Sequence, residues 1–190
     1  MAHFLVEVEF SHTEGLIRDV CQAILERKDR IVEARQEKGG WEGWLQVELA
    51  YYLRRKLGMQ YEIQREQPIF TGRQLIDLWA SPLPGQRNLP CSGVELKVES
   101  EYQTGSGKTL LPRFKNDIIK CDAGPKTAFK AGQGTCLWAI AITSLYEDPA
   151  GYKQVAIDTN TLVCYCPLTV DHEFQMKNVF VLWWARQFKT

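Results

Sequence analysis

The stretch Arg73-Gln-Leu-Ile-Asp-Leu-Trp-Ala80, followed after a proline-rich connection by Gly93-Val-Glu-Leu-Lys-Val-Glu99, decides the fold of this 190-residue chain. In the first segment apolar residues flank Asp77 on both sides, which is typical of a strand with two buried faces. The second segment alternates between apolar and charged residues, so its charged side chains share one face. We expect two adjacent strands that bring Asp77, Glu95 and Lys97 together.

These three side chains suit the chemistry of a divalent metal. A buried carboxylate without a partner is costly and Asp is depleted in strands, so Asp77 needs a cation. Mg²⁺ (or Mn²⁺) binds through one or two carboxylates plus phosphate and water. We predict that Asp77, Glu95 and the backbone carbonyl of Leu96 hold such an ion. Lys97, on the same face as Glu95, would orient or activate the attacking water and balance the developing charge.

A third carboxylate, Glu48, lies in a helix expected from about Trp41 to Leu57, which Gly58 ends. Its neighbours three and four positions away are apolar or aromatic, so Glu48 sits within an aromatic face. Two interpretations stand. The stem packs while the head reaches water or an arginine such as Arg55, or Glu48 joins the Asp77 cluster and binds a second ion or a metal-bound water.

Composition indicates one ordinary soluble domain, since 45% of the residues are hydrophobic and 24% are charged. No apolar run approaches a membrane span of about 18 residues, and Met1 to Phe10 does not resemble a signal peptide. The six cysteines show no disulfide framework, which favours a cytoplasmic setting. A thiolate site from Cys164, Cys166 and His172 is the alternative to simple packing of these cysteines.

Basic residues gather after the predicted site. Residues 101–134 hold six basic and three acidic side chains, although the whole chain has no net charge. Within them Lys108, Arg113 and Lys115 are candidates for binding a phosphate backbone. The Gly105–Thr109 segment resembles a nucleotide-binding loop, but Tyr102 stands where its first glycine belongs, which argues against nucleotide hydrolysis.

The order of the elements resembles the restriction-endonuclease-like, or PD-(D/E)xK, nuclease superfamily. A helix with Glu48 is followed by two strands with Asp77, a strand with Glu95 and Lys97, a helix and a further strand. The resemblance covers about residues 41–146. Ile76 stands where the superfamily name has proline, and 18 residues separate Asp77 from Glu95.

The resemblance implies an α/β fold with a central mixed β-sheet flanked by helices, and the same roles for Glu48, Asp77, Glu95 and Lys97. We expect one domain over residues 1–190, with a core at about 41–146. The segments 1–40 and 147–190 would add a strand at Ala2–Phe10, a helix to about Gln36, and further strands.

The sequence therefore predicts a Mg²⁺-dependent phosphodiesterase, a nuclease that binds nucleic acid, with DNA favoured over RNA. Restriction, defence and repair roles are all compatible with it. The alternative is a catalytically inactive nuclease fold that serves as a nucleic-acid-binding or assembly subunit. Because one active site cuts one strand, we also predict a homodimer.

Overall fold

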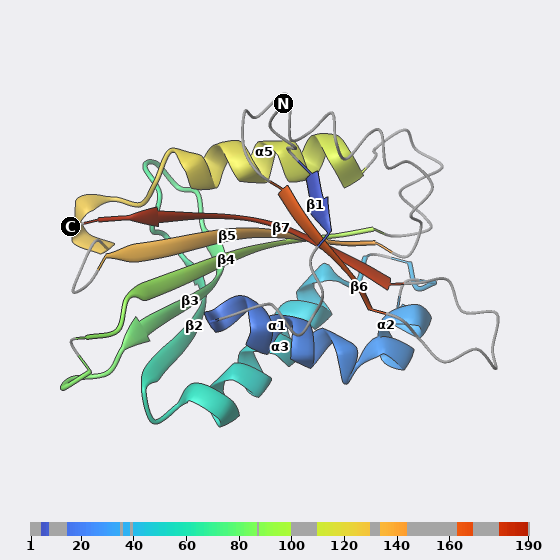
Figure 1. The fold of residues 1–190 in the computed structure, drawn as a ribbon, viewed down its shortest axis with the longest axis horizontal. Coiled ribbons are helices and arrows are strands. Elements are labelled where there is room, and N and C mark those ends of the chain that lie inside the picture. Colours follow the sequence, from blue (N-terminus) through green and yellow to red (C-terminus); the bar gives the residue numbers. More distant parts are fainter. Residues whose placement is uncertain are drawn as a thin grey trace.

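The computed structural model describes residues 5–7, 15–34, 36–38, 40–86, 88–99, 110–129, 134–143, 163–168 and 179–189. They form a β-sheet with helices on both faces (Figure 1). The strands are β1 (Leu5–Glu7), β2 (Tyr61–Gln67), β3 (Ile76–Pro82), β4 (Cys91–Val98), β5 (Thr135–Thr143), β6 (Val163–Leu168) and β7 (Val179–Phe188). The helices are α1 (Gly15–Leu25), α2 (Lys28–Ala34), α3 (Glu42–Leu57), α5 (Leu110–Asp122) and the short 3₁₀ turn η2 (Thr127–Phe129).

The sheet has the order β1-β6-β7-β5-β4-β3-β2 and mixes the two kinds of pairing. β2 pairs with β3, and β3 with β4, in antiparallel fashion. β4 and β5 are parallel, so the chain between them must cross a face of the sheet, and it does so through α5. β7 pairs antiparallel with both β5 and β6, and β1 runs parallel to β6. The predicted α/β class with a central mixed sheet is confirmed.

Each face of the sheet buries its own apolar cluster. α1 and α3 cover one face, where Leu49 of α3 and Leu96 of β4 are fully buried in the same cluster. α5 covers the opposite face with Phe114 and Ile118, which pack in a cluster with Ala139 of β5. Figure 1 shows α5 above the sheet and the three earlier helices below it. The alternation in β4 therefore directs Leu96 toward α3, and the residues on either side of it, Glu95 and Lys97, toward α5.

The N-terminal helix differs from the prediction. In place of one helix to about Gln36, the chain forms α1 and α2 with a turn at residues 26–27. In this turn the N–H of Arg27 donates to the carbonyl of Ile24 at 3.0 Å. The guanidinium of Arg27 then reaches Glu48 on α3. Leu75 is exposed, although the apolar run suggested that it is buried, because β3 begins only at the next residue, Ile76.

The C-terminal strand is buried on both faces at Trp183 and Trp184, as its apolar pattern indicated, but residues 185–187 are exposed. Trp183 packs in the α3 cluster and Trp184 in the α5 cluster, since β7 lies inside the sheet between β5 and β6. Parts of other predicted elements lie outside the described residues, namely most of 2–10, the loop 101–109 and the strand 154–157. Within the described segments, no helix is long and apolar enough to cross a bilayer.

Candidate active site

Asp77 closes the gap where β3 and β4 stop pairing. The ladder between these strands includes Leu78 opposite Val94 and goes no further toward the start of β3. One residue beyond, the side chain of Asp77 takes over, because its Oδ2 accepts the backbone N–H of Leu96 at 2.6 Å. Its Oδ1 accepts a hydrogen bond from the Gln46 side chain on α3 at 2.8 Å. Both carboxylate oxygens of Asp77 are thus held in place next to the point where β3 and β4 separate.

Glu95 lies on the α5 face of β4 and is only 5% exposed. Its Oε1 forms an ion pair with the Nζ of Lys120 on α5 at 2.5 Å. Its Oε2 is buried and has no hydrogen-bond partner among the described residues. Burial raises the pKa of Glu95 to about 8, and the nearby Asp77 and Asp117 add to the rise against the opposing effect of Lys120. The ammonium of Lys120 therefore offsets only part of the cost of burying this carboxylate.

The carboxylate of Asp77 shows the same uncompensated cost of burial. Burial raises its pKa to about 6, although the hydrogen bond from Leu96 lowers it, while the charge of Glu42 raises it further. Both carboxylates have raised pKa values, and the charge of Asp77 adds to the rise at Glu95, so full ionisation of this pair is disfavoured. A bound cation would remove this penalty.

Lys97, two residues after Glu95, is held between two further carboxylates. Its Nζ lies 3.3 Å from Oε1 of Glu42 at the start of α3 and 3.4 Å from Oδ2 of Asp117 on α5. Burial lowers the pKa of Lys97, but Asp117 and Glu42 outweigh that effect and the pKa lies above its usual value. The amine therefore stays protonated at neutral pH and acts as a fixed positive charge.

Glu42 connects α3 to both neighbouring elements. Its Oε2 accepts the backbone N–H of Val98 and lies 3.3 Å from a guanidinium nitrogen of Arg113. The indole N–H of Trp41, just before α3, donates to the carbonyl of Glu99 at 2.7 Å. These bonds fix the first turn of α3 against the end of β4, which places Glu42 beside Lys97.

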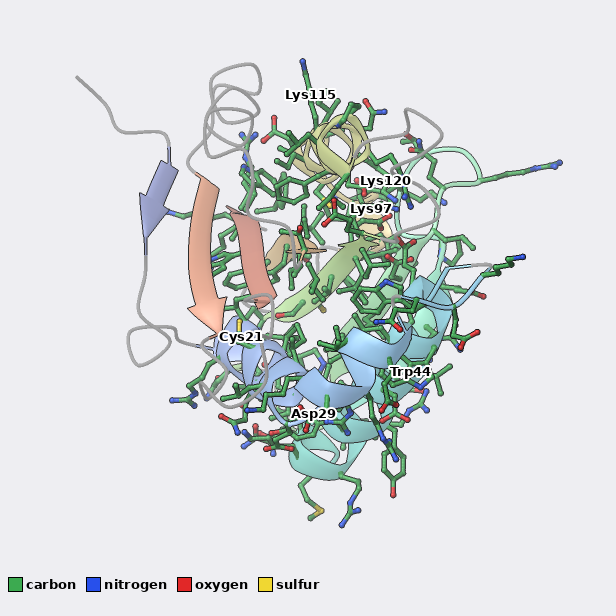
Figure 2. The ribbon with its side chains drawn as sticks, turned by 90° about the vertical axis from the view of Figure 1, so that its right-hand side faces the viewer. Cys21, Asp29, Trp44, Lys97, Lys115 and Lys120 are labelled. Atoms are coloured by element: carbon green, nitrogen blue, oxygen red, sulfur yellow. The ribbon has the colours of Figure 1, made fainter. Side chains whose placement is uncertain are left out.

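The structure brings together most of the residues that the sequence singled out. Asp77, Glu95 and Lys97 lie in one cluster, and Arg113 joins it through Glu42. Figure 2 shows Lys97 and Lys120 close together beneath α5, whereas Lys115 extends away from the body of the molecule. Lys108 lies outside the described residues.

Glu48 is not brought to the cluster. Its Oε2 accepts a hydrogen bond from Nε of Arg27 at 2.9 Å and lies 3.8 Å from Arg30. The partner of the Glu48 head is thus an arginine, as the first interpretation expected, but from the α1–α2 turn rather than Arg55. On α3 the carboxylate that reaches the predicted site is Glu42, about 1.7 turns earlier.

Sequence reasoning missed four residues of the cluster, namely Glu42, Gln46, Asp117 and Lys120. A signal for them exists in the helical spacing. Glu42 and Gln46 are four residues apart on α3 and share a face. On α5, Asp117 and Lys120 are three residues apart and flank the buried stripe that contains Ile118. Lys120 belongs to the basic segment 101–134, and the structure directs it to Glu95.

The donor set fits a hard divalent ion. No group of three or more acidic, His or Cys side chains in metal-binding geometry occurs among the described residues. Two carboxylates with a backbone carbonyl are nevertheless enough for Mg²⁺, which keeps several waters. In an extended strand the N–H and C=O of one residue face the same neighbour, so the Leu96 carbonyl faces the side on which Asp77 lies. The unpartnered Oε2 of Glu95 supplies the remaining buried acceptor.

Comparison of the chain with models of protein families, with curated proteins and with solved structures finds no match.

Proposed function

We propose that this chain is a Mg²⁺-dependent nuclease with a restriction-endonuclease-like fold, and that DNA is its substrate. The observation that carries the proposal is the buried Oε2 of Glu95, which has no hydrogen-bond partner within the described part of the chain. Glu95 lies beside Asp77 and two residues before Lys97. Enzymes gather carboxylates with raised pKa values at such places because a cation or a reacting group completes them.

The fold supports the proposal through its connectivity. The order α3, β2, β3, β4, α5, β5 is the order of elements that the superfamily resemblance expects, and the four strands are neighbours in the sheet. Of the expected site residues, Asp77, Glu95 and Lys97 lie near the point where β3 and β4 separate, whereas Glu48 does not.

The chemistry of phosphodiester hydrolysis assigns a task to each group. Asp77, Glu95 and the Leu96 carbonyl would hold the ion. When bound, the ion stabilises negative charge on the transferred phosphoryl group and lowers the pKa of a coordinated water. Lys97 is held at a fixed point by Glu42 and Asp117. As a protonated amine it orients the attacking water and stabilises the charge that develops on the phosphate.

Arg113 and Lys115 would bind the phosphates on either side of the scissile bond. Arg113 lies at the edge of the cluster, 3.3 Å from Glu42, and Lys115 extends outward from the same helix (Figure 2). Such contacts position the strand and are independent of its sequence.

The test is incubation of plasmid and single-stranded DNA with the protein, with and without Mg²⁺. We expect cleavage that needs Mg²⁺ or Mn²⁺ and stops in EDTA, and its loss in Glu95→Gln. Glu62→Gln is the matched control, because Glu62 is exposed on β2 and contacts Gln64 only at the surface. Cleavage that continues undiminished in EDTA would rule this mechanism out.

The second candidate is an inactive nuclease fold that binds nucleic acid or assembles with other proteins. The Lys120–Glu95 ion pair favours it, because an internal cation already neutralises part of the site. The absence of both cleavage and Mg²⁺ binding, together with retained binding of DNA, would support this candidate over the first.

A further inference from the structure

Lys120 contacts the candidate metal ligand more closely than any other cation that the structure describes. Its Nζ lies 2.5 Å from Oε1 of Glu95 and donates to the carbonyl of Leu75 at 3.1 Å. The ammonium also lies 5.3 Å from the centre of the Phe70 ring. The side chain is 16% exposed, so the charge is largely withdrawn from water. A lysine in such a place serves its partner as a counter-ion.

The charges of the cluster show what this counter-ion replaces. The connected groups are four carboxylates (Glu42, Asp77, Glu95 and Asp117) and three cations (Lys97, Arg113 and Lys120). With all groups ionised the cluster has one excess negative charge, so a divalent ion added to it leaves one excess positive charge. Without the ammonium of Lys120 the same four carboxylates and two cations balance a divalent ion.

A cavity that Lys120 itself lines offers its side chain an alternative position. The cavity has a volume of about 340 Å³ and is lined by Lys120 itself and by Thr71, Gln74, Asn116 and Ala123, among others. These residues come from α5, from the residue that follows it and from the segment between β2 and β3; Lys120 lines the cavity and also contacts Glu95, which does not line it. Rotation about the side-chain bonds of Lys120 would move its ammonium from the carboxylate into this open, partly polar space.

We propose that Lys120 is a built-in competitor for the metal, which pairs with Glu95 in the metal-free protein and moves into the adjacent cavity when the ion binds. In the cavity its ammonium binds a phosphate of the substrate next to the scissile bond. This inference rests on the proposed nuclease function and adds to it a second anion-binding position and a condition for loading the metal.

Coupling follows from this arrangement. A phosphate in the cavity stabilises the displaced lysine, and the displaced lysine leaves Glu95 to the metal. Since coupling between two sites is reciprocal, substrate strengthens metal binding by the same factor as metal strengthens substrate binding. Lys120 neutralises Glu95 in the metal-free site, and the metal binds more tightly when nucleic acid is present.

The first experiment measures Mg²⁺ affinity by calorimetry for the wild-type protein, Lys120→Met and Lys126→Met. Lys126 is a matched control because its Nζ donates to the carbonyl of Pro68 in the same segment between β2 and β3. The titration is done at about pH 9, above the Glu95 pKa of about 8, so that a proton does not take the place of the ammonium. We expect Lys120→Met to bind Mg²⁺ about tenfold more tightly or better, as removal of a like charge implies, and Lys126→Met to bind as wild type does.

A non-cleavable phosphorothioate oligonucleotide provides the coupling measurement. It should tighten Mg²⁺ binding by the wild-type protein at least about fivefold and have a much smaller effect on Lys120→Met. Equal or weaker Mg²⁺ binding by a folded Lys120→Met, with binding by wild type intact, would overturn this inference and leave the nuclease proposal standing. If neither the wild-type protein nor any variant bound Mg²⁺, both this inference and the nuclease proposal would be contradicted.

A second measurement needs no variant. Acetylation of lysines in the wild-type protein, read by mass spectrometry, should modify Lys120 slowly without metal and several times faster when Mg²⁺ is added. The oligonucleotide should slow the reaction again, while Lys126 should react at one rate throughout. A Lys120 rate that Mg²⁺ leaves unchanged would contradict displacement, whatever the behaviour of Lys120→Met.

Discussion

The carboxylate of Asp77 accepts the backbone N–H of Leu96 at 2.6 Å, at the position where β3 and β4 cease to pair. A side chain thus replaces a rung of the sheet. Asp77 has two separable tasks as a result. It satisfies a buried N–H of the strand, and it carries a charge that faces Glu95.

Two substitutions separate these tasks. Asp77→Asn removes the charge and keeps an oxygen for the Leu96 N–H, so the metal-free protein should melt no lower than wild type. Asp77→Ala leaves that N–H unpaired, which costs about 1–3 kcal/mol, and should lower the melting temperature. Both should reduce cleavage at least about a hundredfold, since the ion contributes several kcal/mol. Calorimetric melting and a plasmid cleavage assay check this, and Asp77→Asn with full activity would remove Asp77 from the site.

The raised pKa of Glu95 predicts how stability depends on pH. A carboxyl whose pKa is about 8 in the folded state and near the ordinary 4.5 when unfolded holds its proton more tightly when folded. Its stabilising contribution is complete below about pH 4.5 and is lost as the pH rises to about 8. Asp77, with a pKa of about 6, adds to this loss in the lower part of the window.

We therefore expect the melting temperature of the metal-free protein to fall between pH 5 and pH 8. Glu95→Gln, which is neutral throughout and can still accept from Lys120, should remove most of that fall. Glu62→Gln should melt as wild type does at each pH. A wild-type melting temperature that is constant across this range would contradict the assignment.

Glu42 and Glu48 allow a direct comparison of two carboxylates on one helix. Glu42→Gln weakens the contacts to Lys97 and Arg113, and should lower the cleavage rate about tenfold, as expected for a residue that orients a catalytic group. Glu48→Gln weakens the contact to Arg27. It should leave the rate unchanged and lower the melting temperature by a few degrees. The reverse pattern of rates would restore Glu48 to the site.

Lys97→Met tests the role of the fixed positive charge. Lys97 has no contact with Asp77 or Glu95 comparable to the one it makes with Glu42, so the metal ligands should remain in place. We expect kcat to fall at least about a hundredfold while the affinity for Mg²⁺, measured by calorimetry, does not weaken. Weaker Mg²⁺ binding together with an intact kcat would show that the lysine serves the ligands and not the reaction.

The predicted homodimer remains to be tested, and the structure narrows where its contact can lie. Residues 179–183 of β7 lie between β5 and β6, so a second copy could pair only with residues 184–188, which among the described residues pair with β5 alone. Light scattering at micromolar concentration should give twice the 21.8 kDa mass of one chain. A mass of one chain, unchanged by DNA, would favour cleavage of single strands or nicking.

Local periodicity accounts for what could be predicted of the site. The alternation in residues 93–99 places Glu95 and Lys97 on one face irrespective of the rest of the chain, and the apolar residues around Asp77 mark it as a buried acid. Successive side chains along a strand point to opposite faces of the sheet, so the face of each residue follows from its position in the sequence. For this reason the strand residues of the cluster are readable from the sequence.

The helical residues were not readable in the same way. Lys120 and Lys115 both lie beside the apolar stripe of α5, and the pattern is the same whether a lysine reaches water or a carboxylate. Which of them meets Glu95 depends on the rotation of α5 over the sheet. Glu48 shows the same limit, since its partner Arg27 comes from a turn 21 residues away that interrupts an otherwise continuous helical pattern.

The parallel pairing of β4 with β5 has a consequence for which part of the sequence supplies the cluster. This pairing obliges α5 to cross the face that carries Glu95 and Lys97. Since α3 and β3 supply the other members, every described member of the cluster lies between Glu42 and Lys120. β6 and β7, which come later in the chain, contribute none of them. The cluster therefore comes from one continuous stretch of the sequence, residues 42–120, and β7 supports it only indirectly, through the core that Trp183 and Trp184 fill.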